Sequence, residues 1–163
     1  NGGANTITND GNANLQADWL WFKERSSTSS HHIFDTSRGV GGSGKALYTN
    51  NTDAEAADTA LTSVNTDGFT LANTGGFNEN GQTNVCWQWK CNGGTTATNT
   101  DGATNGYNTT VQANQTAGFS IVQWNAAFDQ GNGRYNLGHG LGKTADFIII
   151  QRNFKYFSKI YFL

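Results

Sequence analysis

Two segments in the second half of this chain have nearly the same order of residue types as two segments in the first half. Because the offset between copies differs for the two pairs, the chain is no uniform solenoid, and we interpret it as a β module reused with unequal insertions. We therefore expect corresponding residues of each pair, such as Trp19 and Phe147, to lie in like environments. The two pairs are Gln16–Arg25 with Thr144–Arg152 and Thr66–Leu71 with Thr116–Ile121.

Most apolar segments are short, alternate with polar residues, and are bounded by Gly, Asn or Asp, which is typical of β-strands joined by turns. With 36% hydrophobic, 13% charged and 12% aromatic residues, the chain has enough large rings to fold around a core. We predict a mainly β protein, an antiparallel β-sandwich of the jelly-roll or lectin-like kind. The predicted strands are Asp18–Lys23, His32–Asp35, Ala46–Thr49, Gly68–Ala72, Thr83–Lys90, Thr109–Ala113, Gly118–Asn125 and Asp146–Arg152.

One short helix is predicted around Asp53–Thr59. Thr52 and Glu55 have the spacing of a capping box, and the segment is rich in Ala, a strong helix former. We expect this helix to connect strands at one end of a sheet.

The distribution of Gly, Asn and Thr divides the chain. We expect a first β module over residues 1–92, a Gly/Asn/Thr-rich loop or linker over 93–107, and strands of a second, incomplete module over 108–163, packed on the first. The apolar end of the chain, Phe154–Leu163, would expose a sticky edge, so it either pairs with an earlier strand or is covered by a neighbouring chain.

The net charge is −2 at pH 7, which gives no electrostatic reason to expect a nucleic acid or an anionic membrane as partner. No run approaches the roughly 18 apolar residues of a membrane span, and no signal-peptide pattern is present. The sequence contains no Met. We therefore expect a processed chain or a piece of a longer one.

The two cysteines, Cys86 and Cys91, are five residues apart, so if the strand extended over both they would point to opposite faces. We expect free thiols, because a disulfide would require the strand to break after Lys90. Too few Cys or His residues lie nearby at ligand spacing to predict a metal site.

The segment Gly39–Ala46 is close to a phosphate-binding loop. Its last position is Ala46 where Ser or Thr would hold Mg²⁺, and no hydrophobic strand precedes it. We interpret it as a Gly-rich hairpin loop, and we predict no cofactor.

The densest polar cluster consists of His31, His32, Asp35 and Arg38. Asp35 and Arg38 are placed to form an ion pair, and the histidines have the chemistry of a metal ligand or a base. No third ligand or activated nucleophile is identifiable, so we interpret the cluster as structural.

The five tryptophans have two interpretations that both stay open. On a strand, Trp19 and Trp21 share one face, as do Trp87 and Trp89. Packed inward, these rings and Trp124 would form the core between sheets. Turned outward, they would form a platform on which sugar rings stack, as in lectin-like sites.

The order and spacing of seven motifs resemble a repeat module of structural proteins from marine bacteriophages, over most of residues 15–152. This resemblance implies a tail-fibre-like or virion-surface protein and no catalytic residues. The motifs are Ala-Asp-Trp-Leu-Trp-Phe-Lys-x-Arg-Ser, His-x-Ile-Phe-Asp-x-x-Arg-Gly, Thr-Asn-x-Thr-x-Ala-Glu, Asp-Gly-Phe-Thr-Leu, Asn-x-x-Gly-x-Thr-x-Val-x-Trp-x-Trp-Lys, Asn-x-Thr-Ala-Gly-Phe-Ser-Ile-Val and Gly-His-Gly-Leu-Gly-Lys-Thr.

We therefore expect a structural or adhesive module at a phage virion surface or tail fibre, located outside the cell. We expect it to self-associate as a homo-oligomer, such as a trimer, or to bind other virion proteins. Host glycan is the candidate ligand. Two alternatives remain. One is a secreted bacterial adhesin fragment. The other is a glycan-degrading enzyme, which would need two acids facing each other across a groove. The acids that the sequence offers for it are Glu24, Asp35, Glu55 and Glu79.

Overall fold

The computed structural model describes residues 3–162 except 74–75, 102–107, 126–135 and 155–156. The described chain is mainly β, with a single 3₁₀ turn, η1 (Gly41–Ser43), as its helical element. All of the strand pairs are antiparallel. The strands are β1 (Asn5–Ile7), β2 (Trp19–Glu24), β3 (His32–Asp35), β4 (Lys45–Tyr48), β5 (Ala56–Ala57), β6 (Leu61–Val64), β7 (Phe69–Leu71), β8 (Asn84–Trp89), β9 (Ala97–Asn99), β10 (Thr109–Asn114), β11 (Phe119–Asn125), β12 (Ile148–Phe154) and β13 (Phe157–Phe162).

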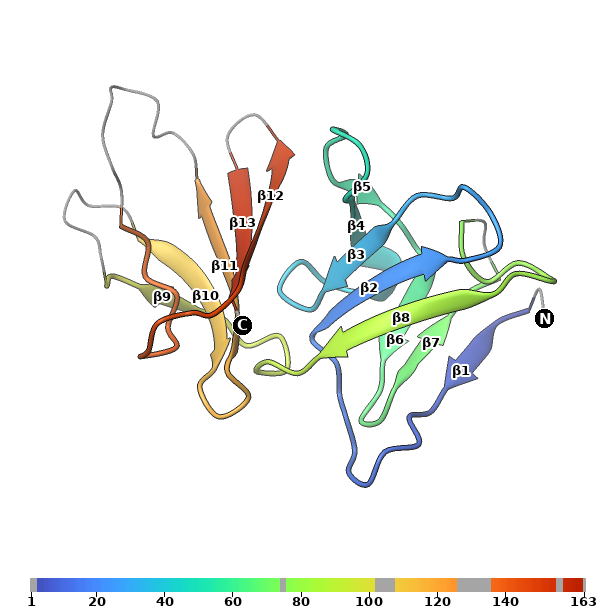
Figure 1. Ribbon diagram of the computed structural model, residues 1–163, viewed down its shortest axis with the longest axis horizontal. Coiled ribbons are helices and arrows are strands. Elements are labelled where there is room, and N and C mark those ends of the chain that lie inside the picture. The colour runs from blue at the N-terminus through green and yellow to red at the C-terminus, as the bar shows by residue number, and fades with distance from the viewer. Residues whose placement is uncertain (1–2, 74–75, 102–107, 126–135, 155–156, 163) are drawn as a thin grey trace.

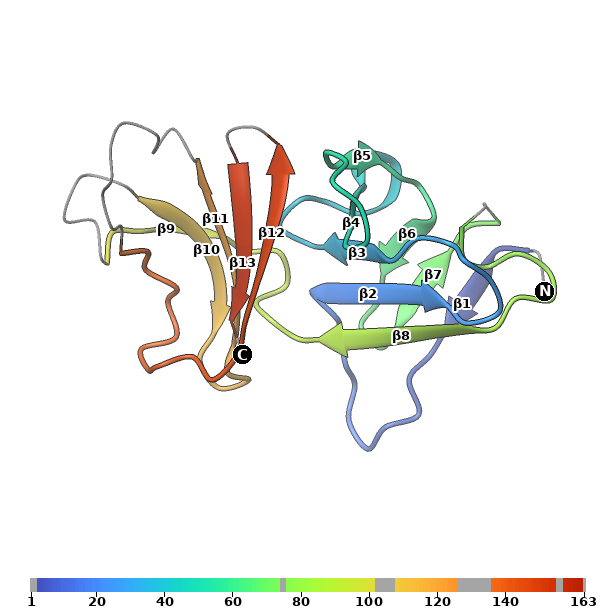
Figure 2. The same cartoon turned by 45° about the horizontal axis from the view of Figure 1, so that its top comes forward.

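The strands form three sheets, which we call the N-terminal, central and C-terminal sheets. Their strand orders are β1-β7-β6, β5-β4-β3-β2-β8 and β12-β13-β11-β10-β9. Figure 1 shows the C-terminal sheet beside the other two, with the N-terminus at the far end of the molecule, and the turned view of Figure 2 agrees. No described helix is long and apolar enough to cross a membrane.

All eight strands predicted from the sequence are confirmed, within two residues at each end. The apolar end of the chain forms β13, which pairs with both β11 and β12, so its prediction as a strand partner is also confirmed. The Gly-rich segment 39–46 contains η1 and leads from β3 into its antiparallel partner β4, as a hairpin loop does. The division into two modules stays a prediction; β9 lies inside the segment expected to link them and pairs with β10.

The predicted helix at Asp53–Thr59 is wrong. Ala56 and Ala57 form β5, which pairs with Lys45 and Ala46 of β4. Upstream, the side chain of Asn51 accepts a hydrogen bond from the backbone N–H of Asp53 at 3.1 Å, which closes a local turn instead of a helical one. Helices this short are marginal without an apolar face to bury, and this Ala-rich segment offers none.

The central sheet has a hydrophobic cluster on each face. Toward the N-terminal sheet, a cluster of buried side chains includes Leu20, Phe22, Phe34, Phe69 and Phe77. On the other face, Trp19, Ile33 and Leu47 pack with Phe119 and Ile121 of β11. The alternation of side chains along β2 and β3 therefore supplies both clusters from the same strands.

A buried carboxylate ties the C-terminal sheet to the central one. Asp18, just before β2, accepts hydrogen bonds from the backbone N–H groups of Cys91 (2.6 Å) and Gly93 (3.1 Å) and from the Thr36 hydroxyl (2.8 Å). Gln112 of β10 continues the network, because its Nε2 donates to the Thr36 hydroxyl at 3.1 Å. These charge-assisted bonds fix the connection between the two sheets.

The two pairs of similar segments differ in whether their corresponding residues lie in like environments. Phe69 and Phe119 are both buried and both follow a Gly with positive φ, so this pair is confirmed as equivalent. Trp19 is 0% exposed and Phe147 is 56% exposed. The expectation of like environments is therefore wrong for the first pair, because β2 lies inside the central sheet and β12 lies at the edge of the C-terminal sheet.

Candidate functional site

Four tryptophans form a continuous ladder on one face of β2 and β8. The register places Trp19 opposite Trp89 and Trp21 opposite Trp87. Ring centroids are 4.7 Å apart for Trp19–Trp89, 5.9 Å for Trp19–Trp21 and 5.4 Å for Trp21–Trp87. Such cross-strand aromatic pairs stabilise a sheet and orient one another.

The ladder runs from the core to the surface. Trp19 is buried between the central and C-terminal sheets, Trp21 and Trp89 are half-buried, and Trp87 is 43% exposed. At the inner end Trp19 is part of the core, whereas at the outer end Trp87 is partly open to solvent. The buried end holds the exposed end in a fixed orientation.

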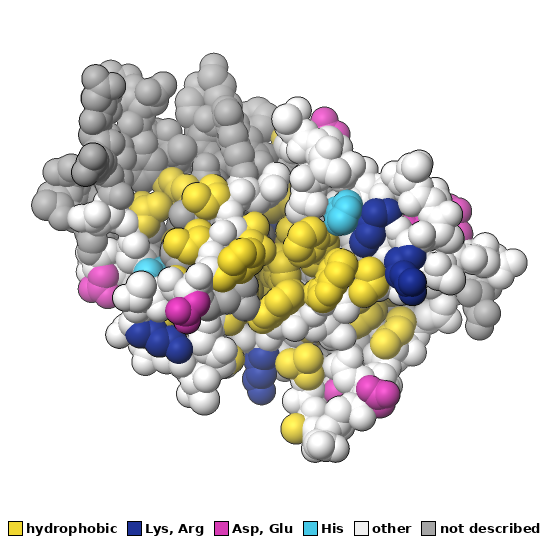
Figure 3. Space-filling view, viewed as in Figure 1, with side chains coloured by type: hydrophobic (Ala, Val, Ile, Leu, Met, Phe, Trp, Pro, Cys, Tyr) yellow, Lys and Arg dark blue, Asp and Glu magenta, His cyan; other side chains and the backbone are white. Residues whose placement is uncertain are grey.

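The surface around this ladder is apolar. Figure 3 shows hydrophobic side chains gathered across the middle of the molecule, over the region where the central and C-terminal sheets meet, with basic side chains and one His along one side of the band. An exposed apolar surface with polar groups at its border suits a ligand that has both an apolar face and hydroxyl groups.

His31 lies at the border of the ladder. The indole Nε1–H of Trp21 donates a hydrogen bond to His31 Nδ1 at 3.0 Å, and the two rings lie 5.6 Å apart. Burial lowers the pKa of His31, and the nearby Lys23 lowers it further. A neutral imidazole can accept this bond at Nδ1 and then carries its proton on Nε2, where it is a donor.

Trp124 does not belong to the ladder. It packs against the buried residues Val111, Val122 and Leu141, on the face of the C-terminal sheet that points away from the central sheet. Of the five tryptophans expected to contact a ligand, the structure therefore brings four together.

The predicted polar cluster is divided. His31 lies beside the ladder, whereas His32 lies on the opposite face of β3, where its ring contacts Phe77 and Tyr48 and its Nε2 lies 3.8 Å from Asp58. Burial is the main cause that lowers the pKa of His32, against the opposing effect of Asp58. The two histidines therefore do not act together.

Asp35 and Arg38 form the predicted ion pair, with Arg38 Nε 2.6 Å from Asp35 Oδ2, and both side chains are almost fully buried. Arg38 also donates to the backbone carbonyls of Lys45 (3.0 Å) and Ile33 (3.1 Å). Glu55 lies 3.5 Å from Arg38 and 3.0 Å from Lys45. This network connects the β3–β4 hairpin with the start of β5.

The four acids considered for an enzyme lie at three places, because Asp35 and Glu55 share one partner. Asp35 and Glu55 contact Arg38. Glu24 accepts hydrogen bonds from Ser29 and from Ser26 (2.8 Å), and these bonds lower its pKa. Glu79 lies on an exposed turn. Within the described ranges, no group of three His, Cys, Asp or Glu side chains is placed to hold a metal ion.

Cys86 and Cys91 are free thiols on different sides of the central sheet. Cys91 packs in the cluster with Trp19, and its Sγ lies 2.9 Å from the Gln112 carbonyl oxygen. Burial raises the pKa of the Cys91 thiol to about 12 and that of Cys86 even further above the usual range. Both thiols are therefore protonated and react slowly at neutral pH.

Sequence reasoning missed His31 as a neighbour of the tryptophans, because the contact depends on how the chain turns between β2 and β3. It also missed the exposure of Phe147, Ile148 and Ile150, which on an apolar strand are expected to be buried. One sequence signal could have separated His31 from His32. Neighbouring residues on a strand point to opposite faces, so the two histidines were not expected to lie on the same side.

No curated protein and no solved structure matches this chain. A family model described as a domain of unknown function (DUF7483) matches residues 1–161. The chain belongs to this DUF7483 family.

Proposed function

We propose that this chain is an adhesive module of a phage virion surface or tail fibre that binds host-surface glycan. The proposal rests on the resemblance to repeat modules of phage structural proteins and on the tryptophan ladder. It places the protein outside the cell, in contact with other virion proteins or with further copies of itself.

The single observation that carries glycan binding is the exposure of Trp87 at the end of the ladder. A half-exposed indole held by Trp21 at 5.4 Å is pre-organised, so little conformational entropy is lost when a ligand stacks on it. The C–H face of a pyranose ring can cover this indole while its hydroxyl groups reach border donors such as His31.

The finer architecture in this proposal is a lectin-like β-sandwich. It is supported by the packing of Phe22 and Phe34 of the central sheet against Phe69 of the N-terminal sheet. A single stacking contact binds weakly, so adhesion would rely on several copies held together, each adding a weak contact.

Self-association forms part of the same proposal. Phe147, Ile148 and Ile150 are large apolar side chains that are at least half exposed along β12 and the residue before it. Ile148 and Ile150 share one face of β12, and exposed apolar side chains on one face favour association with another protein surface. Sedimentation of the wild type and of Ile150→Lys checks this: the substitution should shift the chain toward monomer, and an unchanged mass distribution would contradict a role of β12.

The glycan-binding proposal is tested with a glycan array and a pull-down of host envelope material. We expect Trp87→Ala to weaken binding about tenfold or more, equivalent to about 1.4 kcal/mol of stacking. Thr98→Ala is the control, because it truncates an exposed side chain on the edge strand β9 of the C-terminal sheet and should leave binding unchanged. Absence of binding at millimolar sugar would leave only the scaffold role.

A further inference from the structure

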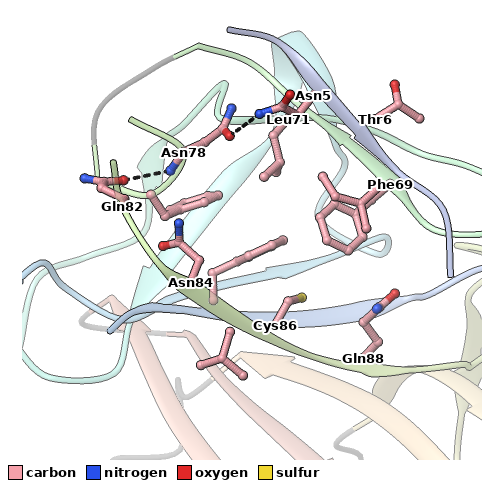
Figure 4. Close-up of a pocket in the computed structure, with 13 residues that line it drawn as sticks. Asn5, Thr6, Phe69, Leu71, Asn78, Gln82, Asn84, Cys86 and Gln88 are labelled. Carbon is pink, nitrogen blue, oxygen red and sulfur yellow. Dashed lines mark hydrogen bonds between the residues drawn. The ribbon is translucent and has the colours of Figure 1, made fainter. Parts of the chain in front are cut away.

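A cavity of about 530 Å³ lies between the N-terminal and central sheets. It is lined from β1, β7, β2 and β8 and from the turn that precedes β8. Figure 4 shows Asn84, Cys86 and Gln88 projecting from one side of β8 toward Leu71 and Phe69 on the opposite sheet. This is the reverse face of β8 from Trp87, so the cavity is separate from the tryptophan ladder.

The walls of the cavity combine carboxamides with apolar side chains and carry no charge. No Asp, Glu, Lys, Arg or His is among its lining residues, and burial keeps the Cys86 thiol protonated. The apolar part includes Phe22, Phe69, Leu71 and Phe77. The five carboxamides are Asn5, Asn78, Gln82, Asn84 and Gln88.

Two of these carboxamides hold the cavity in shape. Asn78 accepts a hydrogen bond from Asn5 at 2.7 Å and donates to the carbonyls of Ala72 (2.7 Å) and Gly3 (3.0 Å). Gln82 Oε1 accepts from the backbone N–H groups of Asn78 (2.9 Å) and Glu79 (2.8 Å). Their acceptor atoms are thus occupied, and they fix the wall rather than contact a ligand.

Two further carboxamides, Asn84 and Gln88 of β8, have hydrogen-bonding groups without a partner among the described residues. Gln88 Nε2 donates to Asn9 Oδ1 at 2.9 Å, and Asn9 Nδ2 in turn donates to the Leu15 carbonyl at 3.2 Å, which fixes the orientation of both amides. Gln88 Oε1 is then a buried acceptor without a partner among the described residues. Asn84 makes no side-chain hydrogen bond to any described residue.

We propose that this cavity binds one or two rings of an uncharged saccharide, at a second site independent of Trp87. An acceptor that lacks a partner calls for an O–H or N–H donor. Asn84 offers both a donor and an acceptor, and the adjacent apolar wall suits the C–H face of a sugar ring. The volume lies within the range of small-molecule sites, and the absence of charged lining residues disfavours ionic ligands.

The test uses methyl α-glycosides of glucose, galactose, mannose and N-acetylglucosamine as probes. Binding is followed by ligand-observed NMR and by shifts of the backbone amide NMR signals of Cys86 and Gln88, which line the cavity. We expect at least one glycoside to shift these signals, and Asn84→Ala to weaken its binding about tenfold. Asn108→Ala, an exposed Asn just before β10, is the matched control and should change nothing.

Comparison with the ladder variant separates the two sites. Trp87→Ala should leave glycoside binding in the cavity intact, even if it abolishes binding to the glycan array. Binding that Trp87→Ala removes and Asn84→Ala does not would overturn the cavity site and leave the proposed function standing. Failure of all four glycosides to shift the Cys86 and Gln88 signals at millimolar concentration would overturn the proposed saccharide site.

Discussion

β2 lies inside the central sheet between β3 and β8, whereas β12 lies at the edge of the C-terminal sheet and pairs with β13 alone in the described chain. The two strands have similar sequence patterns. Phe22 is buried and its counterpart Ile150 is 66% exposed. A strand with two neighbours and a sheet on each face buries both sets of side chains, but an edge strand leaves part of the same pattern in contact with solvent.

The second pair of similar segments behaves differently. Gly68 and Gly118 both have positive φ, both precede a buried Phe, and both begin the second strand of a hairpin. A tight turn needs only local sequence, so its copies fold alike. The environment of a strand depends on which distant segments pack against it, so its copies need not.

The largest effect is expected at the paired positions Phe22 and Ile150. Phe22→Ala removes a buried ring that stacks on Phe77 at 4.6 Å, and it should lower the free energy of unfolding by about 3–5 kcal/mol. Ile150→Ala should cost less than about 1 kcal/mol at concentrations low enough to keep the chain monomeric, because its side chain is then mostly in water. Urea unfolding of both variants checks this; equal losses would mean that β12 is covered in solution.

The carboxylates that precede the two strands give a second matched test. Asp18→Asn places an amide group among the donors of Cys91, Gly93 and Thr36, and it should destabilise the protein by about 2–3 kcal/mol. Asp146→Asn alters an exposed side chain and should change stability by less than about 0.5 kcal/mol. Thermal unfolding of the two variants under identical conditions measures the difference, and similar melting temperatures would contradict the role of Asp18.

Substitution of the turn glycines Gly68 and Gly118 should lower the stability by different amounts, although their local structures are alike. An added Cβ at Gly68 would lie 2.0 Å from the Ile7 carbonyl oxygen, whereas at Gly118 its nearest neighbour would be the flexible ammonium group of Lys143, at 3.5 Å. Both substitutions to Ala strain the backbone by about 1 kcal/mol, and Gly68→Ala adds a clash with β1 that should raise the loss to about 2 kcal/mol or more. Denaturant midpoints give the order; a larger loss at Gly118 would refute it.

The smallest effect is expected in the pH dependence of the unfolding free energy. It arises at the histidines that follow β2, which have no counterpart in the sequence after β12. The pKa of His32 is lowered in the folded state, mainly by burial, so the unfolded chain binds the proton more tightly. Stability should therefore be full above about pH 6.5, the ordinary His value, and decrease as the pH falls below it. Unfolding free energies at pH 8 and pH 5.5 should differ less in His32→Gln than in the wild type, and an unchanged pH dependence would exclude His32 as its source.

The sequence predicted the strands that carry alternating large side chains and missed those that depend on a distant partner. β5 consists of Ala56 and Ala57, which form a strand because Lys45 and Ala46 lie beside them. β1 is a short polar segment that pairs with β7, more than sixty residues away. The pairing of β5 with β4 outweighs the helix propensity of Asp53–Thr59, because local preference is weak when tertiary contacts compete with it.

For the candidate site, the sequence determined that Trp19 and Trp21 share a face and that Trp87 and Trp89 share another, because alternation is a property of any strand. Only the tertiary structure decided that these faces coincide, that Trp19 is buried and Trp87 exposed, and that a cavity opens behind β8. Burial is set by the pairing and layering of segments far apart in the chain, and local sequence does not encode which of two similar strands will be covered.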